Sequence, residues 1–278
     1  MNHPTVTSRE YKVMLRQSRF AGDRTRQRTA ADGFWREFRD RVAGLALGTT
    51  GGFDTEKDRR FIRFYDTARQ TLHGSRYILR RRWDASRGAQ DGSQKAELTL
   101  KFRHPDRYIA QDHVAEDGAL QTKFEEDIKG PFASLYSVSM TPRAPNGDVP
   151  LSLRSLADLF PGVKDVVPDT NAGEHLEAVG GLTALEVVLG GAAIQIGTNT
   201  AADCALIFWY ETSSDQHADP IAVEFSYRHR DKDGDYRGAR IQRAFDMFEA
   251  LQTKLPDWID PEVTTKTALV YKRAALFA

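Results

Sequence analysis

The sequence contains a single cysteine, Cys204, among its 278 residues. A disulfide scaffold and a cysteine-rich zinc site each need several cysteines, so both are excluded. Cys204 lies in the apolar run Cys-Ala-Leu-Ile-Phe. We therefore interpret it as a small buried hydrophobic residue.

Long hydrophobic runs are also lacking. No stretch approaches the roughly 20 apolar residues that an α-helix needs to span a bilayer. The N-terminal segment of 16 residues lacks the apolar core of about 7–15 residues found in a secretory signal peptide. We expect a protein that is not embedded in a membrane, with a cytoplasmic location.

The chain has no excess of one charge sign. It carries 39 basic and 39 acidic residues, and this balance argues against a generic nucleic-acid binder. The two signs are unevenly distributed, with a net charge of +11 over residues 1–110 and −11 over residues 111–278. Of the basic residues, 28 are arginine, whose planar guanidinium suits phosphate. An arginine-rich genomic composition explains most of them equally well, so only specific positions are informative.

The overall composition is that of a folded protein. Hydrophobic residues make up 40% and charged residues 28% of the chain, which excludes disorder as its main state. The length allows one large domain or two small ones. Since neither a repeat nor a linker is visible, we expect one domain over residues 1–278, with a loop-rich insertion at about 131–180.

Residue patterns predict more strands than helices. Alternating and short apolar patterns place strands at 5–15, 60–65, 77–83, 97–103, 121–128, 182–196, 205–211, 221–230 and 266–273. Helical spacing places helices at 31–47, 152–160 and 237–254, with Asp32 and Ser152 as N-caps, and a short helix at 68–72. We expect the arginine-rich segment 17–30 to be a loop and 48–52 a turn.

Several predicted strands carry charged side chains at every second position. Such side chains share one face of a sheet, because side chains alternate along a strand. They are Glu10 and Lys12, then Arg80 and Arg82, then Lys123, Glu125 and Asp127. Two arrangements satisfy this pattern: an open sheet whose charged face meets solvent, or a closed barrel with a charged, hydrated interior.

Four segments in chain order narrow the choice. They are Glu10-x-Lys12, Phe64-Tyr65-Asp66-Thr67 with Leu79-Arg80-Arg81-Arg82, Leu98-Thr99-Leu100-Lys101, and Lys123-x-Glu125-x-Asp127. This ordered set resembles the CYTH superfamily, the triphosphate tunnel metalloenzymes. The superfamily includes inorganic and thiamine triphosphatases, RNA triphosphatases and class IV adenylyl cyclases. The resemblance is strongest over residues 60–128.

The resemblance implies a fold and a site. The fold is β-dominated α+β, a closed antiparallel barrel of about eight strands that forms a tunnel with flanking helices. In such a tunnel, basic side chains hold a triphosphate, and carboxylates hold one or two Mg²⁺ or Mn²⁺ ions.

The same resemblance assigns roles to individual residues. The implied catalytic residues are Lys12, Arg80, Arg82 and Lys101. The implied substrate-binding residues are these four together with Lys123 and Lys266, for which Lys272 is a rival. The implied metal ligands are Glu10, Glu125, Asp127 and Glu224.

Two departures from the family pattern concern the metal ligands. Ser8 and Ser226 stand where the family has glutamates, so two carboxylates are missing. Two functions therefore stay open. One is metal-dependent hydrolysis of an inorganic, nucleoside or thiamine triphosphate, and the other is a non-catalytic polyphosphate- or nucleotide-binding barrel with a degenerate metal site.

A third reading, which does not use the phosphate-binding residues, is a barrel that only mediates protein interactions. Residues 131–200 either cap one tunnel mouth or mediate homodimer formation.

Overall fold

The computed structural model describes residues 4–85, 96–114, 118–143, 148–164, 171–211, 219–262 and 265–275. The strands are β1 (Ser8–Leu15), β2 (Gly48–Thr50), β3 (Thr55–Asp66), β4 (Tyr77–Asp84), β5 (Ala96–His104), β6 (Leu120–Lys129), β7 (Ala133–Pro142), β8 (Glu177–Gly190), β9 (Ala193–Gly197), β10 (Thr200–Glu211) and β11 (Ala222–Arg230). The α-helices are α1 (Arg24–Val42), α2 (Thr71–Gly74), α3 (Arg107–Gln111), α4 (Leu153–Leu159), α5 (Ala239–Lys254) and α6 (Lys266–Ala274). Short 3₁₀ helices span Gln17–Phe20 and Pro161–Val163. None of the helices in these ranges is long and apolar enough to cross a membrane.

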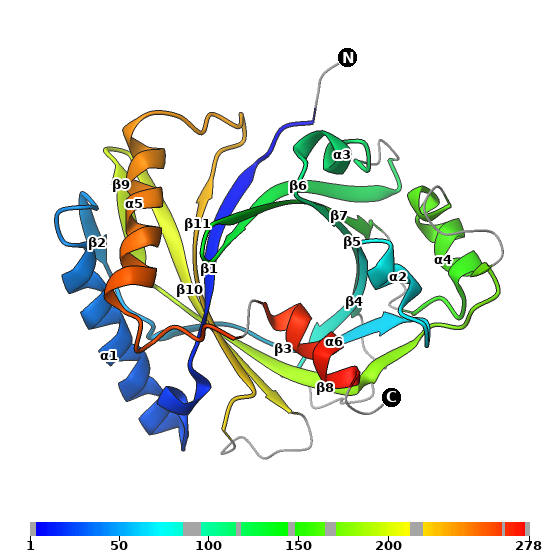
Figure 1. The fold of residues 1–278 in the computed structure, drawn as a ribbon, viewed down its shortest axis with the longest axis horizontal. Helices are drawn as coiled ribbons and strands as arrows, with labels where there is room; N and C mark the ends of the chain where they lie inside the picture. The colour runs from blue at the N-terminus through cyan, green and yellow to red at the C-terminus, as the bar shows by residue number, and fades with distance from the viewer. Residues whose placement is uncertain are drawn as a thin grey trace.

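Nine of the strands form a closed barrel, which Figure 1 shows nearly end-on. Around the ring the order is β11-β1-β6-β7-β5-β4-β3-β8-β10, and pairing of β10 with β11 closes it. Strands β9 and β2 extend the sheet beyond β10. The expected closed barrel is confirmed, with two corrections: it has nine strands rather than about eight, and β1 pairs in parallel with β6. Because β1 and β6 are far apart in the chain, no tight turn constrains them to run antiparallel.

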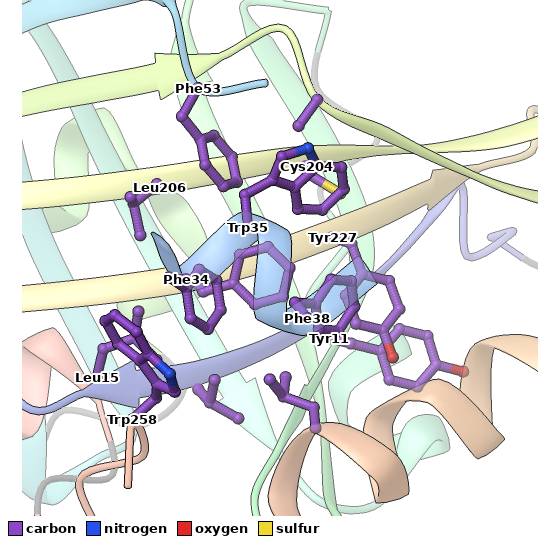
Figure 2. Close-up of a cluster of buried hydrophobic side chains, with 14 of the residues drawn as sticks. Tyr11, Leu15, Phe34, Trp35, Phe38, Phe53, Cys204, Leu206, Tyr227 and Trp258 are labelled. Carbon is purple, nitrogen blue, oxygen red and sulfur yellow. The ribbon is translucent and has the colours of Figure 1, made fainter. Parts of the chain in front are cut away.

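Apolar side chains cover the outside of the barrel rather than filling its inside. On one side, α1 and α5 cover the outer face of β1, β10 and β11 (Figure 1). Figure 2 shows Phe34, Trp35 and Phe38 of α1 packing in this layer with Tyr11 and Tyr227. On the opposite side, α2, α3 and α4 cover β4, β5, β6 and β7. With the apolar layers on the outside, the inner face is left free for charged residues.

The C-terminal helix α6 closes one end of the barrel interior. Its Val270 and Tyr271 pack against inward-facing Ile62, Phe64 and Trp209. The prediction of a strand at 266–273 is therefore wrong. A short segment with β-branched and apolar residues does not distinguish strand from helix by its pattern, and the Thr265 side chain caps the helix by accepting a hydrogen bond from the Ala268 backbone N–H.

Other elements differ from expectation at their ends. Helix α1 begins at Arg24 instead of residue 31, since Asp23 rather than Asp32 caps it and arginine favours helices. Strand β7 lies in the segment from about residue 131 that the sequence analysis expected to be rich in loops, so it was not predicted. Its Tyr136, Val138 and Met140 nevertheless alternate as in a strand. The helix capped by Ser152 is confirmed.

The segment expected to be a turn at 48–52 contains strand β2 followed by Gly51. Gly51 has a positive φ of 65°, and a Cβ at this position would collide with the carbonyl oxygen of Gly191. Its own carbonyl accepts a hydrogen bond from the Trp35 indole N–H at 2.7 Å. Only glycine permits the close approach of residue 51 to Gly191. The hydrogen bond from Trp35 then connects α1 to the sheet extension.

The outer apolar layer is expected to carry much of the stability. Replacing fully buried Phe38 by alanine should lower the free energy of unfolding by about 3–5 kcal/mol, because the change removes buried area and leaves a cavity. Exposed Arg39→Ala on the same helix is the control, expected within about 0.5 kcal/mol of wild type. Urea unfolding followed by circular dichroism measures both, and equal losses in the two variants would contradict this packing.

Candidate functional site

The barrel encloses a cavity of about 470 Å³ lined by charged side chains. All ten residues that the sequence analysis assigned to the site line it: Glu10, Lys12, Arg80, Arg82, Lys101, Lys123, Glu125, Asp127, Glu224 and Lys266. They come together because each lies at an inward position of a strand that alternates in and out, or, for Lys266, at the start of α6. The structure thus confirms their common location, while their roles remain predictions.

Positive charge exceeds negative charge in this cavity. Among the residues that the structure describes, ten basic and seven acidic side chains line it. The basic side chains are Lys12, Arg60, Arg80, Arg82, Lys101, Arg103, Lys123, Lys129, Arg228 and Lys266. The acidic ones are Glu10, Asp58, Glu97, Glu125, Asp127, Glu186 and Glu224. An excess of three positive charges in a partly desolvated space favours an anionic ligand.

One group of ion pairs centres on Lys12. The register of the sheet places Glu10 of β1 between Asp127 of β6 and Arg228 of β11. The Lys12 Nζ lies 2.9 Å from Glu10 Oε2 and 3.0 Å from Asp127 Oδ1. Arg228 donates to Glu10 at 2.9 Å. Burial acts to raise the pKa of Glu10, but the charges of Lys12 and Arg228 outweigh it and hold that pKa well below its usual value.

Lys101 of β5 lies next to this group. Its Nζ is 3.1 Å from Asp127 Oδ2, and Arg103 on the same strand is 3.6 Å from the same oxygen. Burial lowers the pKa of Lys101 to about 8, with Arg103 and Lys12 acting in the same direction and Asp127 opposing them. Lys101 is therefore a buried amine whose charge changes close to neutral pH.

A second group of ion pairs centres on Lys266 of α6. Its Nζ lies 3.1 Å from Glu224 Oε1 and 3.4 Å from Glu186 Oε2. Glu186 faces Arg60 across β3 and β8, and it also accepts a hydrogen bond from the Trp209 indole at 2.7 Å. Burial acts to raise the pKa of Glu186, yet Lys266 and Arg60 lower it well below its usual value.

Arg80 differs from the other buried cations. Its neighbours across the sheet are Phe64 and Thr99, neither of which carries a charge. Within the described parts of the chain Arg80 makes no ion pair, and its Nε is buried without a hydrogen-bond partner. Burial, and secondarily the charge of Arg82, lower the pKa of Arg80 well below its usual value. The site therefore contains a half-buried guanidinium that has no ion-pair partner in the described parts of the chain, with Glu186 and Glu97 acting on it only at longer range.

Arg82 is only weakly compensated. Its closest carboxylate contact is Glu97, at 3.9 Å. Burial and the charge of Arg60 lower the pKa of Arg82 to about 10. Two successive inward positions of β4 thus present guanidinium groups to the cavity.

The Asp66-Thr67 segment of the sequence motif has a structural role here. The Asp66 carboxylate accepts hydrogen bonds from the backbone N–H groups of Leu72 and His73 at the start of α2. It also accepts one from the Tyr271 hydroxyl at 3.0 Å. These contacts join the end of β3 to α2 and α6, outside the cavity.

The carboxylates do not fit a metal ion in this arrangement. Among the described residues, no three acidic, histidine or cysteine side chains come together in a way that could hold one. Of the four predicted ligands, Glu10, Asp127 and Glu224 are each bonded to lysine. Glu125 lines the cavity without an ion-pair partner in the described ranges. The expectation of Mg²⁺ or Mn²⁺ therefore finds no ligand cluster here.

Within the described ranges, sequence reasoning missed seven charged residues of the cavity: Asp58, Arg60, Glu97, Arg103, Lys129, Glu186 and Arg228. Arg103 and Arg228 continue the inward alternation of Lys101 and Glu224, so the period itself could have identified them. Arg60 lies at an inward position of β3, and Glu186 is the acid within the otherwise apolar second half of strand β8. Of the two candidates for the C-terminal lysine, Lys266 lines the cavity, whereas exposed Lys272 does not.

Three solved structures are similar to this chain over nearly its full length. The protein HpAC1 from Hippeastrum, a candidate adenylyl cyclase reported to have a dominant triphosphatase activity, is 13% identical, with a TM-score of 0.43 and coverage of 96% of this chain and 95% of that one. Candidate adenylate cyclases from Bacillus halodurans and Vibrio parahaemolyticus are 9% and 10% identical, with TM-scores of 0.40 and 0.38. They cover 95% and 96% of this chain, and 97% and 99% of their own.

No family model matches the sequence. No curated protein matches it either. The closed barrel, with the motif residues gathered in its interior, is the arrangement that the resemblance to the CYTH superfamily implies.

The ionisation of Lys101 can be measured directly. In a side-chain NMR titration of lysine-labelled protein, its midpoint should fall near pH 8, because burial disfavours the ammonium form. Asp127→Asn should lower the midpoint further, since Asp127 opposes the shift. A midpoint at the ordinary lysine value of about 10.4 would contradict the described burial.

Proposed function

We propose that this chain is a divergent member of the CYTH superfamily that binds the triphosphate group of a small molecule inside its barrel. The binding residues are the inward-facing Arg80, Arg82 and Lys101, with Lys12 and Lys266 beside them. Lys123 lies exposed on β6 at the edge of the cavity and would contact the ligand as it enters.

The observation that carries this proposal is the unpaired Arg80. Its guanidinium is half-buried, its Nε is fully buried without a hydrogen bond, and it has no ion-pair partner in the described ranges. Such a cation is costly, so its presence points to a ligand that supplies the negative charge. Phosphate oxygens suit a guanidinium because its N–H groups match them in geometry and charge. The excess of positive charge around Arg80 extends this preference to a ligand with several negative charges.

A second candidate function is metal-dependent hydrolysis of the bound triphosphate, with Mg²⁺ or Mn²⁺ as cofactor. It is favoured by Glu125, a carboxylate that lines the cavity and is available for another partner. The lysine contacts of Glu10, Asp127 and Glu224 disfavour it. The geometry therefore supports binding more strongly than catalysis.

Binding is tested on strand β4, which offers a matched pair of arginines. Arg80→Gln should weaken the binding of inorganic triphosphate by roughly 10- to 100-fold, since a hydrogen bond to a charged group contributes about 1.5–3 kcal/mol. Arg81→Gln is the control, because Arg81 lies on the outer face over the Trp83 ring. Isothermal titration calorimetry gives both affinities. Equal loss in the two variants would remove the case for a site inside the barrel.

Hydrolysis is tested by release of phosphate from inorganic triphosphate and ATP with Mg²⁺ or Mn²⁺. If the second candidate is right, wild type releases phosphate, and both Glu125→Gln and Lys101→Ala lose the activity. Arg81→Gln should retain it. Triphosphate binding without turnover under either metal would reject hydrolysis and leave binding as the function.

A further inference from the structure

Each of the two ion-pair groups in the cavity has a lysine ammonium between two carboxylates. Lys12 contacts Glu10 and Asp127, and Lys266 contacts Glu186 and Glu224. Both lysine side chains are 14% exposed, and the four carboxylate side chains range from 3% to 13%. A buried carboxylate pair needs a cation to remain ionised, and here the chain itself provides it.

We infer that Lys12 and Lys266 are built-in cations that take the place of divalent metal ions, so that the barrel binds its triphosphate as the metal-free anion. This inference rests on the proposed triphosphate binding and adds the form in which the ligand is bound. It also divides the basic residues into two groups. Lys12 and Lys266 each lie between two carboxylates and neutralise them, while Arg80 and Arg82 face the ligand. Lys101 contacts only one carboxylate, Asp127, and faces the ligand beside the two arginines.

Competition between the ammonium groups and a metal ion supports this inference. Mg²⁺ requires oxygen ligands in near-octahedral geometry at about 2.0–2.1 Å. To bind the Glu186 and Glu224 pair, it would have to displace the Lys266 ammonium into a cavity that already has an excess of positive charge. A tethered ammonium also competes at a high effective concentration, because it cannot diffuse away.

The sequence around these pairs is consistent with the same inference. At Ser8 and Ser226, where the family resemblance implies further carboxylates, this chain has hydroxyl groups. Both serines are buried. A hydroxyl adds no negative charge, so the carboxylates present already have cationic partners from the chain. Lys266 and Arg60 contact the Glu186 and Glu224 pair, and Lys12 and Arg228 contact the Glu10 and Asp127 pair, with Lys101 and Arg103 also at Asp127. The positive charge of the cavity that exceeds its negative charge is then available to the ligand.

The first experiment uses the wild-type protein and sodium tripolyphosphate in calorimetry. We expect the affinity to be the same with EDTA as without it, and to fall when Mg²⁺ is added in excess, because Mg²⁺ sequesters the free anion. Binding that is lost in EDTA and restored by Mg²⁺ or Mn²⁺ would overturn the inference while leaving the proposed function intact. Absence of binding under every condition would instead reject the proposed function.

The second experiment measures Mn²⁺ binding to the ligand-free protein by electron paramagnetic resonance. Lys266→Met frees the Glu186 and Glu224 pair and should raise the affinity for Mn²⁺ by roughly tenfold or more, since affinity follows the net charge of the ligands. Lys266→Arg, which keeps the charge, and Lys272→Met, on an exposed residue of the same helix, should behave like wild type.

Thermal unfolding of each variant shows that it is folded before metal is added. If Lys266→Met does not fold, the calorimetric comparison in EDTA and Mg²⁺ decides the question by itself. Tight Mn²⁺ binding by wild type, equal to that of Lys266→Met, would show that the lysine does not occupy a metal position.

Discussion

Charge compensation inside a closed sheet is the constraint on which this structure depends. When nine strands close into a ring, their inward side chains share one space, and any charge there must find a partner or a ligand. The register of β1 meets this requirement locally by setting Glu10 between Asp127 and Arg228. The helices contribute by burying the apolar layer on the outside, which lets the interior remain polar.

The barrel interior has an apolar part and a charged part. Beside Val270 and Tyr271 of α6 the inner face is apolar, with Ile62, Phe64 and Trp209, whereas Lys266 at the start of the helix contacts Glu186 and Glu224. Along the same strands the next inward positions carry charge, as in the step from Ile62 to Arg60. The apolar side chains reduce the access of water to the neighbouring charged residues, which strengthens the electrostatic interactions between those charges.

Much of this arrangement was predictable from residue periodicity, but the pairings were not. Alternation along Lys123-x-Glu125-x-Asp127 was enough to place those side chains on one face, and closure of the sheet brought all ten predicted residues into one cavity. Which carboxylate meets which lysine depends on register between strands that are distant in sequence, as for Lys12 with Asp127. Helix α6 was mistaken for a strand because its short pattern fits both conformations, and the Thr265 cap and the packing of Val270 and Tyr271 decide between them.

The pairing of β1 has a consequence for the order in which the molecule assembles. The contact of Arg9 with Glu126 spans 117 residues, and that of Arg228 with Glu10 spans 218. Strand β1 therefore pairs at both edges only after β6 and the distant β11 have been synthesised, and such long-range closure slows folding. Residues of β1, β11 and α6 all line the cavity, so these three elements must come together before the cavity has all of its charged residues. Ligand affinity would thus report on closure of the barrel.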